Sequence, residues 1–160
     1  MPLLEVKNQL GVQFNWENIG IKTRVEKNKL YFFDPIRKRF LQCTPEEEVR
    51  QWVVYHLTQV LDYPIINITV EKQIKYLNRN KRFDILIYKD AKPIFLIECK
   101  APKVAVNQTT LNQISTYNFA LNVPYLLITN GANQICCKVE NARKTYEFLE
   151  AIPSYKSLLS

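Results

Sequence analysis

Two neighbouring apolar segments constrain the fold of this chain more than any other feature. FDILIY (residues 83–88) and PIFLIECK (93–100) flank a short polar turn. Both are rich in strand-forming residues and nearly continuous in apolar side chains, as expected where both faces of a sheet are covered. The sequence therefore predicts two adjacent antiparallel strands, over residues 82–88 and 93–99, inside a sheet.

A helix is predicted ahead of these strands. In TPEE, Thr44 is a suitable N-cap, proline occupies the first helical position, and Glu47 has the spacing of a capping-box partner. Apolar residues then follow helical spacing until Tyr63-Pro64 ends the helix. The expected buried face comprises Val49, Trp52, Val53, His56, Leu57 and Val60. His56 is interpreted as a packed core residue.

The remaining segments complete the element order. Residues 65–77 alternate as a half-buried strand should, and NRNK (78–81) forms the next turn. A polar helix is expected over about 106–121, a strand over 123–129, another strand in ANQICCKV, and a terminal helix over 145–152. The face expected for the first of these strands is Ile66, Ile68, Val70, Ile74 and Tyr76.

This order, α-β-β-β-α-β, predicts an α/β (α+β) fold with a mixed sheet flanked by helices. Residues 1–43 are predicted to form a small β-rich N-terminal extension, with strands in GIKTRV and KLYFF and a basic turn in FDPIRKRF. Residues 44–160 hold the main domain, and the whole is expected to be one globular unit.

Composition limits the classes of function. The net charge of +7 suits a polyanionic partner. No apolar run is long enough to span a membrane and no signal-peptide pattern is present, so we expect a cytoplasmic protein without a membrane partner. Four cysteines lack metal-site spacing and indicate structural thiols rather than zinc ligands. Only three glycines argue against a phosphate-binding nucleotide loop.

Asp84, Glu98 and Lys100 are the polar residues of the apolar strand pair, and they lie at the same end of it. Side chains alternate along a strand, so Glu98 and Lys100 share a face. Asp84 joins that face if an odd-length loop or a bulge pairs it with an even-numbered residue. Two carboxylates would then hold a hard cation such as Mg²⁺, with an ammonium beside it. A structural ion pair between Lys100 and either acid is the alternative.

The spacing D-x₁₃-E-x-K resembles the PD-(D/E)xK nuclease superfamily, and more closely the N-terminal nuclease domain of type I restriction enzyme R subunits. RFDILIY, ECKAP, Gln113-x-x-x-Tyr117 and YLLITNG carry the resemblance, together with TPEEEVRQ and DYP upstream. It covers about residues 40–150.

The resemblance implies a restriction-endonuclease-like core and a set of site residues. Mg²⁺, or alternatively Mn²⁺, would bind Asp84, Glu98 and the backbone carbonyl of Cys99, and Lys100 would serve the hydrolytic water. Gln113 and Tyr117 would lie beside the site. They are also i, i+4 neighbours on a helix, so an ordinary helix-surface hydrogen bond is the alternative.

Glu46 is a further candidate ligand, since sites of this family often take an acid from the first helix. The alternative is a solvated first-turn glutamate favoured by the helix dipole.

Basic residues precede the strand that carries Asp84. Arg79, Lys81 and Arg82 stand in or near the predicted turn, with Lys72 and Lys75 upstream, and Lys103 follows Lys100. We expect Arg79, Lys81, Arg82 and Lys103 to contact DNA phosphates. A solvated charge run is the alternative.

The sequence therefore predicts metal-dependent hydrolysis of DNA phosphodiesters, most simply by an endonuclease. A non-catalytic DNA-binding or assembly module that keeps the nuclease frame is the rival function. Restriction R subunits continue into a helicase motor, whereas these residues contain no Walker motif, so we expect no ATP-driven translocation from them. DNA is the expected partner, and a homodimer or a separate motor or recognition subunit are both open.

Overall fold

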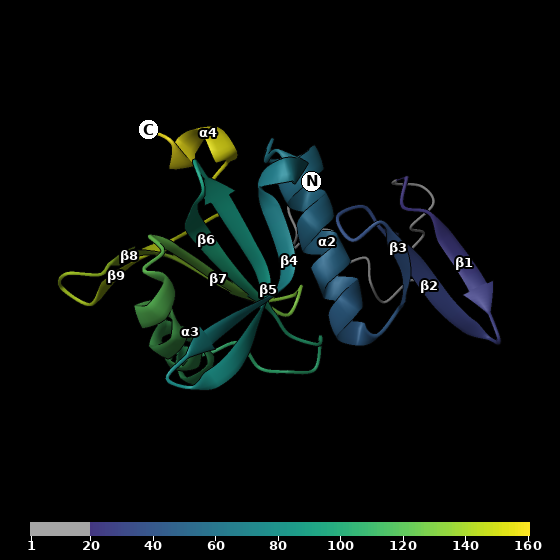
Figure 1. Ribbon diagram of the computed structural model, residues 1–160, viewed down its shortest axis with the longest axis horizontal. Helices are drawn as coiled ribbons and strands as arrows, with labels where there is room; N and C mark the ends of the chain where they lie inside the picture. Colours follow the sequence, from purple (N-terminus) through teal and green to yellow (C-terminus); the bar gives the residue numbers. More distant parts are fainter. Residues whose placement is uncertain (1–19) are drawn as a thin grey trace.

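The computed structural model describes residues 20–160, which form two sheets and three α-helices (Figure 1). The smaller sheet contains β1 (Thr23–Glu26), β2 (Lys29–Asp34) and β3 (Arg39–Gln42). The larger sheet contains β4 (Ile68–Tyr76), β5 (Arg79–Lys89), β6 (Lys92–Cys99), β7 (Tyr125–Thr129), β8 (Gln134–Glu140) and β9 (Thr145–Leu149). The helices are α2 (Pro45–Gln59), α3 (Gln108–Leu121) and α4 (Tyr155–Leu158), with a 3₁₀ turn η2 (Ile65–Asn67) before β4.

The larger sheet is mixed, as the sequence predicted. Its strands lie in the order β4-β5-β6-β7-β8-β9, and β6 pairs with β7 in parallel while its other neighbouring pairs are antiparallel. A parallel pair needs a crossover connection, and α3 supplies it. The order α2, β4, β5, β6, α3, β7 confirms the expected α-β-β-β-α-β core in an α+β fold.

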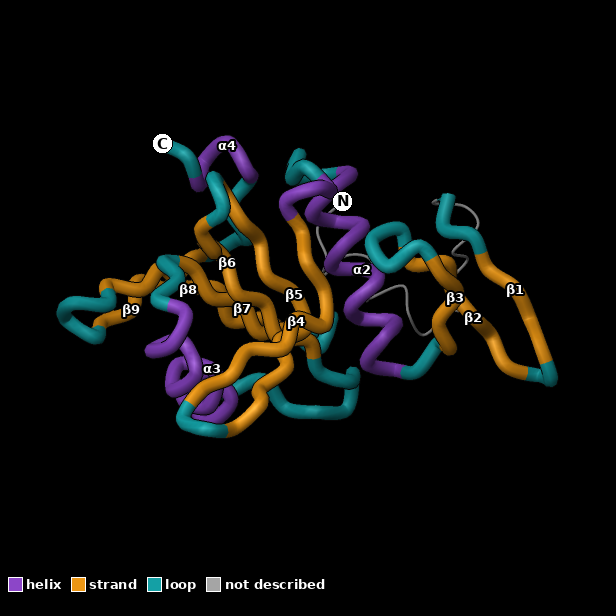
Figure 2. Tube along the Cα trace, viewed as in Figure 1, coloured by secondary structure: helices purple, strands orange, loops and turns teal. Residues whose placement is uncertain are grey.

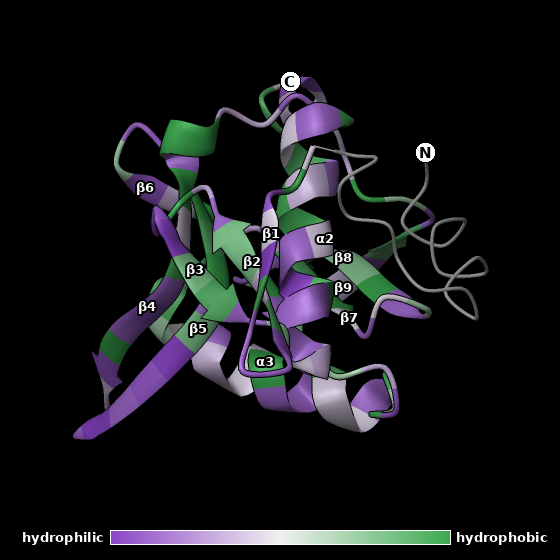
Figure 3. Ribbon diagram, turned by 90° about the vertical axis from the view of Figure 1, so that its right-hand side faces the viewer, coloured by the Kyte–Doolittle hydropathy of each residue, from purple (hydrophilic) through white to green (hydrophobic). Residues whose placement is uncertain are grey.

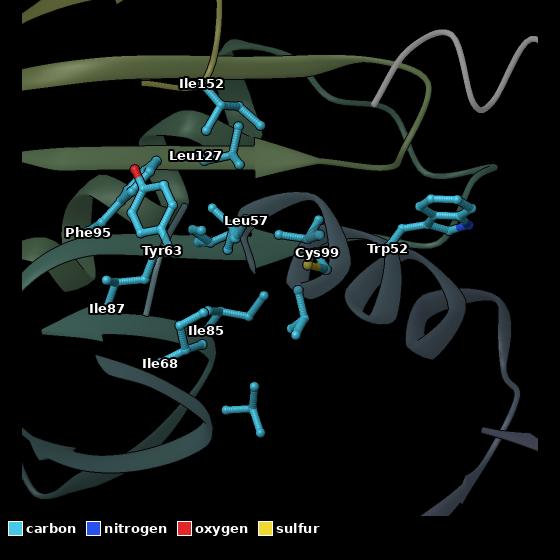
Figure 4. Packing of buried hydrophobic residues seen from close by; sticks show 14 of the residues in the cluster. Trp52, Leu57, Tyr63, Ile68, Ile85, Ile87, Phe95, Cys99, Leu127 and Ile152 are labelled. Atoms are coloured by element: carbon cyan, nitrogen blue, oxygen red, sulfur yellow. The ribbon is translucent and has the colours of Figure 1, made fainter. Parts of the chain in front are cut away.

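Both faces of this sheet are covered, which explains the two nearly continuous apolar strands. α2 lies between the two sheets, and α3 lies on the other face of the larger sheet (Figure 1). The α2 side includes Leu57, Ile85 and Ile87 (Figure 4), whereas Leu86 and Leu96 pack on the α3 side. Each such fully buried side chain stabilises the fold by about 1.5–3 kcal/mol.

The start of α2 is predicted correctly, but its end and one cap contact are not. Thr44 Oγ1 accepts the Glu47 N–H at 3.1 Å. The capping-box role of Glu47 is wrong, because the Thr44 N–H bonds the carbonyl of Gln42 and the Glu47 carboxylate faces a buried ion network. The helix ends at Gln59, before the expected stop at Tyr63-Pro64, and Asp62 then takes a left-handed φ of 59°.

The hairpin of β4 and β5 changes face in its middle. Ile68 and Val70 pack on the α2 side, whereas Ile74 packs on the α3 side. The change occurs where Glu71 takes a left-handed φ of 56° and drops out of the register opposite Asp84. The predicted single apolar face of this strand is therefore wrong. Ile66 also lies outside the strand, in η2, and is 89% exposed.

Both hairpin turns are tight. Leu77 and Asn78, with φ of 47° and 59°, connect β4 to β5, so the predicted NRNK turn is wrong and β5 already begins at Arg79. Asp90 and Ala91, with φ of 48° and 62°, connect β5 to β6. Two successive positive φ values are the geometry that the twist of a two-residue hairpin favours.

The C-terminal segment is a strand where a helix was expected. β9 pairs with β8, with Phe148 opposite Cys137, and a helix forms only after Pro153, as α4. In TYEFL the half-buried residues are Tyr146 and Leu149, and this spacing of three residues occurs in helices as well, so a segment of five residues does not distinguish the two structures. The predicted helix over 106–121 and the strands in 123–129 and ANQICCKV are confirmed as α3, β7 and β8.

The predicted strands of the N-terminal region are confirmed as β1 and β2, and β3 was not predicted. Whatever was expected of residues 1–19 lies outside the described residues. Within residues 20–160, no helix is long and apolar enough to cross a membrane.

Candidate functional site

A bulge at Ile94 of β6 sets the register of Asp84 and Glu98. The two-residue turn pairs Lys89 with Lys92, but the register shifts between Ile87 and Tyr88, so that Ile85 lies opposite Ile97. One further step in this register brings Asp84 level with Glu98. Without the bulge the same turn would have placed Asp84 opposite Ile97. The bulge is one of the two devices that the sequence argument required.

Asp84 is buried and held by two donors. Its Oδ2 accepts the backbone N–H of Cys99 at 2.7 Å, and its Oδ1 accepts a hydrogen bond from Nη2 of Arg50 at 3.1 Å. The first bond fixes Asp84 against the end of β6. The second bond connects Asp84 to α2, next to the break in the β4–β5 ladder at Glu71.

Glu98 is the most strongly perturbed carboxylate of this region. Burial, and then the charge of Asp84, raise the pKa of Glu98 to about 7, although Lys100 and Lys81 act in the opposite direction. The Nζ atom of Lys100 lies 3.2 Å from Oε1 of Glu98, which confirms that the two share a face. A carboxylate whose ionisation is disfavoured by burial and by a neighbouring acid, with a lysine beside it, is an arrangement that a divalent cation relieves.

A cavity of about 280 Å³ lies between the sheet and α3. Its lining includes Glu98 and Lys100 from the β6 end, and Gln113 and Tyr117 from α3. The remaining lining residues are Lys81, Phe83, Thr110 and Ile114. Glu98 and Lys100 belong to one predicted motif, and Gln113 and Tyr117 to another. The four side chains line one cavity because the side of α3 that carries Gln113 and Tyr117 packs over the end of β6.

Tyr117 is fixed by the distal part of the β4–β5 hairpin, which bends toward α3 (Figure 2). The Nζ atom of Lys81 lies 4.2 Å from the centre of the Tyr117 ring. The rings of Phe83 and Tyr117 pack edge to face, with their centroids 6.4 Å apart. The face change at Glu71 and Asp84 is what directs Phe83 and Lys81 to this side.

Other predicted site residues lie outside the cavity lining. Asp84 is not part of it, although its charge reaches Glu98. Glu46 is 47% exposed in its side chain and lies 3.4 Å from Arg50. Arg82 pairs with Glu71 at 2.9 Å, while Arg79 and Lys103 are exposed, on the hairpin and on the loop after β6. Of the four predicted DNA contacts, Lys81 is the one that lines the cavity.

Arg50 is a buried residue of this region that the sequence argument missed. It is 4% exposed, its guanidinium forms an ion pair with Glu71 at 2.9 Å, and it donates a hydrogen bond to Asp84 at 3.1 Å. It also bonds Glu47 closely and Glu46 at 3.4 Å. Burial lowers the pKa of Arg50, but the charges of Glu47, Asp84 and Glu71 outweigh burial and raise it above its ordinary value.

A second arginine connects this network to the smaller sheet. Arg37, in the turn after β2, donates to Asp34 and to Glu47, both at 2.6 Å. Gln51 bridges the same two carboxylates at 3.1 and 3.0 Å. In sequence, EEEVRQ has the appearance of a solvated charged helix face. The spacing of Glu46 and Glu47 from Arg50, four and three residues, predicts ion pairs within the helix. The pairs with Glu71 and Asp84 have no such signal, because these residues are distant in the chain.

A magnesium site at Asp84 and Glu98 would have two carboxylates as its side-chain ligands. Among the side chains of residues 20–160, no group of three or more His, Cys, Asp or Glu is arranged to hold a metal ion. Mg²⁺ is commonly bound by one or two carboxylates together with substrate phosphates. Asp84 and Glu98 are near enough for the charge of Asp84 to raise the pKa of Glu98, but the Asp84 carboxylate is already bound by Arg50 and by the Cys99 N–H and does not line the cavity.

The four cysteines are free thiols, and Cys99, Cys136 and Cys137 are buried. Burial raises the pKa of Cys43 and of Cys136 to about 12. Thiols held in the neutral form are poor nucleophiles and poor metal ligands, in line with the structural role expected of them.

Comparison with known proteins points to restriction enzymes. A family model, described as type I restriction enzyme R protein N terminus (HSDR_N), matches residues 45–153. Among solved structures, a fragment of an HsdR subunit of a type I restriction enzyme from Vibrio vulnificus YJ016 is similar, with a TM-score of 0.56 and 19% sequence identity. The similarity covers 73% of this chain and 25% of the Vibrio chain, so the present chain spans about a quarter of that protein. No curated protein sequence matches the chain.

Proposed function

This chain belongs to the family of type I restriction enzyme R protein N-terminal domains, and from that premise we propose that it is a metal-dependent deoxyribonuclease. The reaction is hydrolysis of DNA phosphodiester bonds, and cleavage within the strand is the mode we propose. The family match supports a nuclease-related role, and the geometry around Glu98 supports the chemistry.

One observation carries the proposal. Glu98 stands between the charge of Asp84, which raises its pKa, and the ammonium of Lys100 at 3.2 Å, and it lines the same cavity as Gln113 and Tyr117. Neither a structural ion pair nor a helix-surface hydrogen bond calls for these residues from β6 and α3 to share a cavity. A phosphodiesterase site needs such a convergence of acids, a lysine and polar positioning groups.

Asp84, Glu98 and the Cys99 carbonyl would hold the cofactor, Mg²⁺ or Mn²⁺. When bound, such an ion polarises a phosphoryl oxygen and makes a bound water more acidic. The Cys99 N–H and the Arg50 guanidinium donate hydrogen bonds that keep the Asp84 carboxylate in place. Lys100 keeps a positive charge beside Glu98, which favours the ionised carboxylate that a cation requires.

Lys100, Gln113 and Tyr117 act on the substrate side of the cavity. The Lys100 ammonium would orient the attacking water and stabilise negative charge that develops on the phosphorus centre. Gln113 and Tyr117 would hydrogen-bond the DNA backbone and hold it near Lys100. Lys81, over the Tyr117 ring, adds a positive charge to the wall along which a phosphate would lie.

Assembly with other subunits is part of the proposal. Because the relatives named above belong to type I restriction enzymes, we propose that this domain acts together with a motor or recognition subunit, or as a pair of identical chains. The rival function, a DNA-binding module without catalysis, would keep the basic residues but would have no need of the Glu98–Lys100 arrangement.

The test compares binding and cleavage on the same DNA. The chain is incubated with covalently closed plasmid and with circular single-stranded DNA, in Mg²⁺, in Mn²⁺, in Ca²⁺ and in chelator. We expect cleavage of circular DNA in Mg²⁺ or Mn²⁺, and binding without cleavage in Ca²⁺. Binding in all conditions with no cleavage of any DNA would favour the non-catalytic module.

A further inference from the structure

The smaller sheet has one face against α2 and one face directed away from it (Figure 1). Phe32 and Asp34 of β2 are buried on the α2 side, where Gln51 donates a hydrogen bond to Asp34 at 3.1 Å. Because side chains alternate along a strand, the intervening residues of β2 and their cross-strand partners form the other face, which we call the outer face. Its basic and aromatic residues are Lys22, Arg24, Lys29, Tyr31, Phe33 and Phe40.

The three aromatic residues of the outer face are neighbours. Strand register places Phe33 opposite Phe40, and their rings pack edge to face with centroids 5.4 Å apart. Tyr31 is the next residue along β2 on the same face. All three are half-buried, so part of each side chain stays open to solvent. A group of rings on a sheet surface is a stacking platform for unpaired nucleobases, since every base has a π face.

Cations lie over these rings. The Arg24 guanidinium is 4.4 Å from the centre of the Phe40 ring and 5.6 Å from that of the Tyr31 ring. The Nζ atom of Lys22 is 5.9 Å from the centre of the Phe33 ring. A base that stacks on this face would therefore bring its phosphate within reach of a positive charge. Basic and aromatic groups interleaved in this way are what a single strand of nucleic acid requires.

The outer face carries a net positive charge. Lys22, Arg24 and Lys29 are exposed on it. Within β1, β2 and β3, Glu26 is the one acid that shares this face, and its ion pair with Arg24, at 3.3 Å, leaves about half of each side chain exposed. A polyanion is thus the complementary partner, and an exposed ion pair of this kind costs little to separate.

We propose that the outer face binds single-stranded DNA, with bases stacked on its three aromatic rings and phosphates held by its three cations. A duplex keeps its bases paired and stacked on one another, so it cannot use the rings. The choice of DNA over RNA rests on the proposed function, whereas the stacking surface rests only on the sheet. This surface is separate from the cavity at Glu98, because α2 and the larger sheet lie between them.

The experiment measures the fluorescence anisotropy of a labelled oligo(dT) of about eight nucleotides, within the site sizes of such surfaces. Chelator is present throughout, so no metal ion joins the oligonucleotide to Glu98. Wild type is compared with Tyr31→Leu combined with Phe33→Leu, which keeps apolar bulk and removes two rings. We expect this double variant to bind oligo(dT) about tenfold more weakly or worse, and to bind a duplex of the same length as wild type does.

The matched control is Tyr146→Leu combined with Phe148→Leu. These two residues also share one face of a strand, β9, and Phe148 is 60% exposed. The control should bind oligo(dT) like wild type. In addition, Lys22→Gln combined with Arg24→Gln should flatten the log–log salt dependence by up to about 1.4, because each phosphate contact on a single strand contributes about 0.7.

Equal oligo(dT) affinity for wild type and for the variant of Tyr31 and Phe33 would overturn the inference and leave the rings a role within the sheet alone. Equal losses in the variant and its control would overturn it as well. Tighter binding of oligo(U) than of oligo(dT) would overturn the assignment to DNA. Each of these results leaves the proposed nuclease site untouched, since plasmid cleavage tests that site separately.

A measurement on the unaltered chain decides if the variant of Tyr31 and Phe33 does not fold. Ultraviolet light crosslinks oligo(dT) to side chains that it contacts, and mass spectrometry of the peptides locates them. We expect crosslinks in β2 and β3. Crosslinks confined to the β4–β5 hairpin or to the cavity lining, or none, would overturn the inference and favour a protein partner for the outer face.

Discussion

Lys100 places its Nζ atom 3.2 Å from Oε1 of Glu98, on the side of the sheet that faces Gln113 and Tyr117. The two side chains leave consecutive same-face positions at the end of β6, so the pairing follows directly from strand geometry. In the proposed reaction the lysine serves two purposes, keeping Glu98 ionised and stabilising charge on the phosphate.

The first prediction concerns this lysine. Lys100→Met should reduce the rate of DNA cleavage at saturating Mg²⁺ by about 10²-fold or more, because a charge that stabilises the transition state is lost. The fold should persist, since Lys100 is partly exposed. The matched control is Lys92→Met at the other end of β6, which should cleave at the wild-type rate. Equal rates for the two variants would exclude Lys100 from the chemistry.

The second prediction concerns stability and pH in the presence of chelator. Glu98 has a pKa of about 7 in the folded chain and an ordinary one, about 4.3, in the unfolded chain. Between these values the folded state binds a proton that the unfolded state has lost, so the free energy of unfolding falls as the pH rises, and it levels off above about 7.

Glu98→Gln removes this loss. At about pH 8 the variant should be more stable than wild type by up to about 3 kcal/mol, and at about pH 4 the two should be nearly equal. Urea unfolding at a series of pH values measures this. A stability difference that does not change with pH would show that Glu98 titrates normally.

The third prediction concerns metal affinity. A proton and a cation compete for Glu98, so below a pH of about 7 the affinity for Ca²⁺ should fall by about tenfold per pH unit, and proton release should accompany binding. In Lys100→Met the fall should begin at a higher pH, because the lysine charge lowers the pKa of Glu98. Calorimetry in buffers of different ionisation enthalpy measures both quantities. Binding that is independent of pH would place the ion elsewhere.

The fourth prediction concerns the distal half of the β4–β5 hairpin, which is strongly hydrophilic (Figure 3). Arg79→Ala combined with Lys81→Ala should weaken binding similarly for unrelated DNA sequences and flatten the log–log salt dependence by up to about two units. Arg82 is kept because it pairs with Glu71. A salt titration in Ca²⁺ gives the slope.

The control for this double variant carries the same loss of charge elsewhere. Lys138→Ala combined with Arg143→Ala removes two exposed cations from β8 and the turn after it. Its slope should equal that of wild type. If both double variants flatten the slope alike, binding reflects net charge rather than the hairpin.

The β5–β6 hairpin and the pair Gln113 and Tyr117 on α3 could be predicted because their sequence signals are local. Apolar runs of strand length, the spacing from Asp84 to Glu98, and the i, i+4 pair Gln113 and Tyr117 each depend on one or two neighbouring elements. Strand alternation then required a bulge or an odd loop, and the shift at Ile87 and Tyr88 supplies it.

The burial of Arg50 could not be predicted for the opposite reason. Its surroundings combine α2 with Glu71 and Asp84 of the hairpin, and their meeting depends on the left-handed Glu71. A glutamate with positive φ has no sequence signal comparable to a glycine. The same break turned Ile74 to the α3 side and made the predicted single face of its strand wrong.

Nicking of supercoiled plasmid across a Mg²⁺ titration, for wild type and Glu98→Gln side by side, tests the central claim most directly. The account predicts Mg²⁺-dependent nicking by wild type, none by Glu98→Gln, and equal DNA binding by both in Ca²⁺, because glutamine keeps the shape and loses the charge that the cation needs. Glu140→Gln, at the exposed end of β8, is the matched control and should nick like wild type. Equal nicking by wild type and Glu98→Gln would contradict the claim.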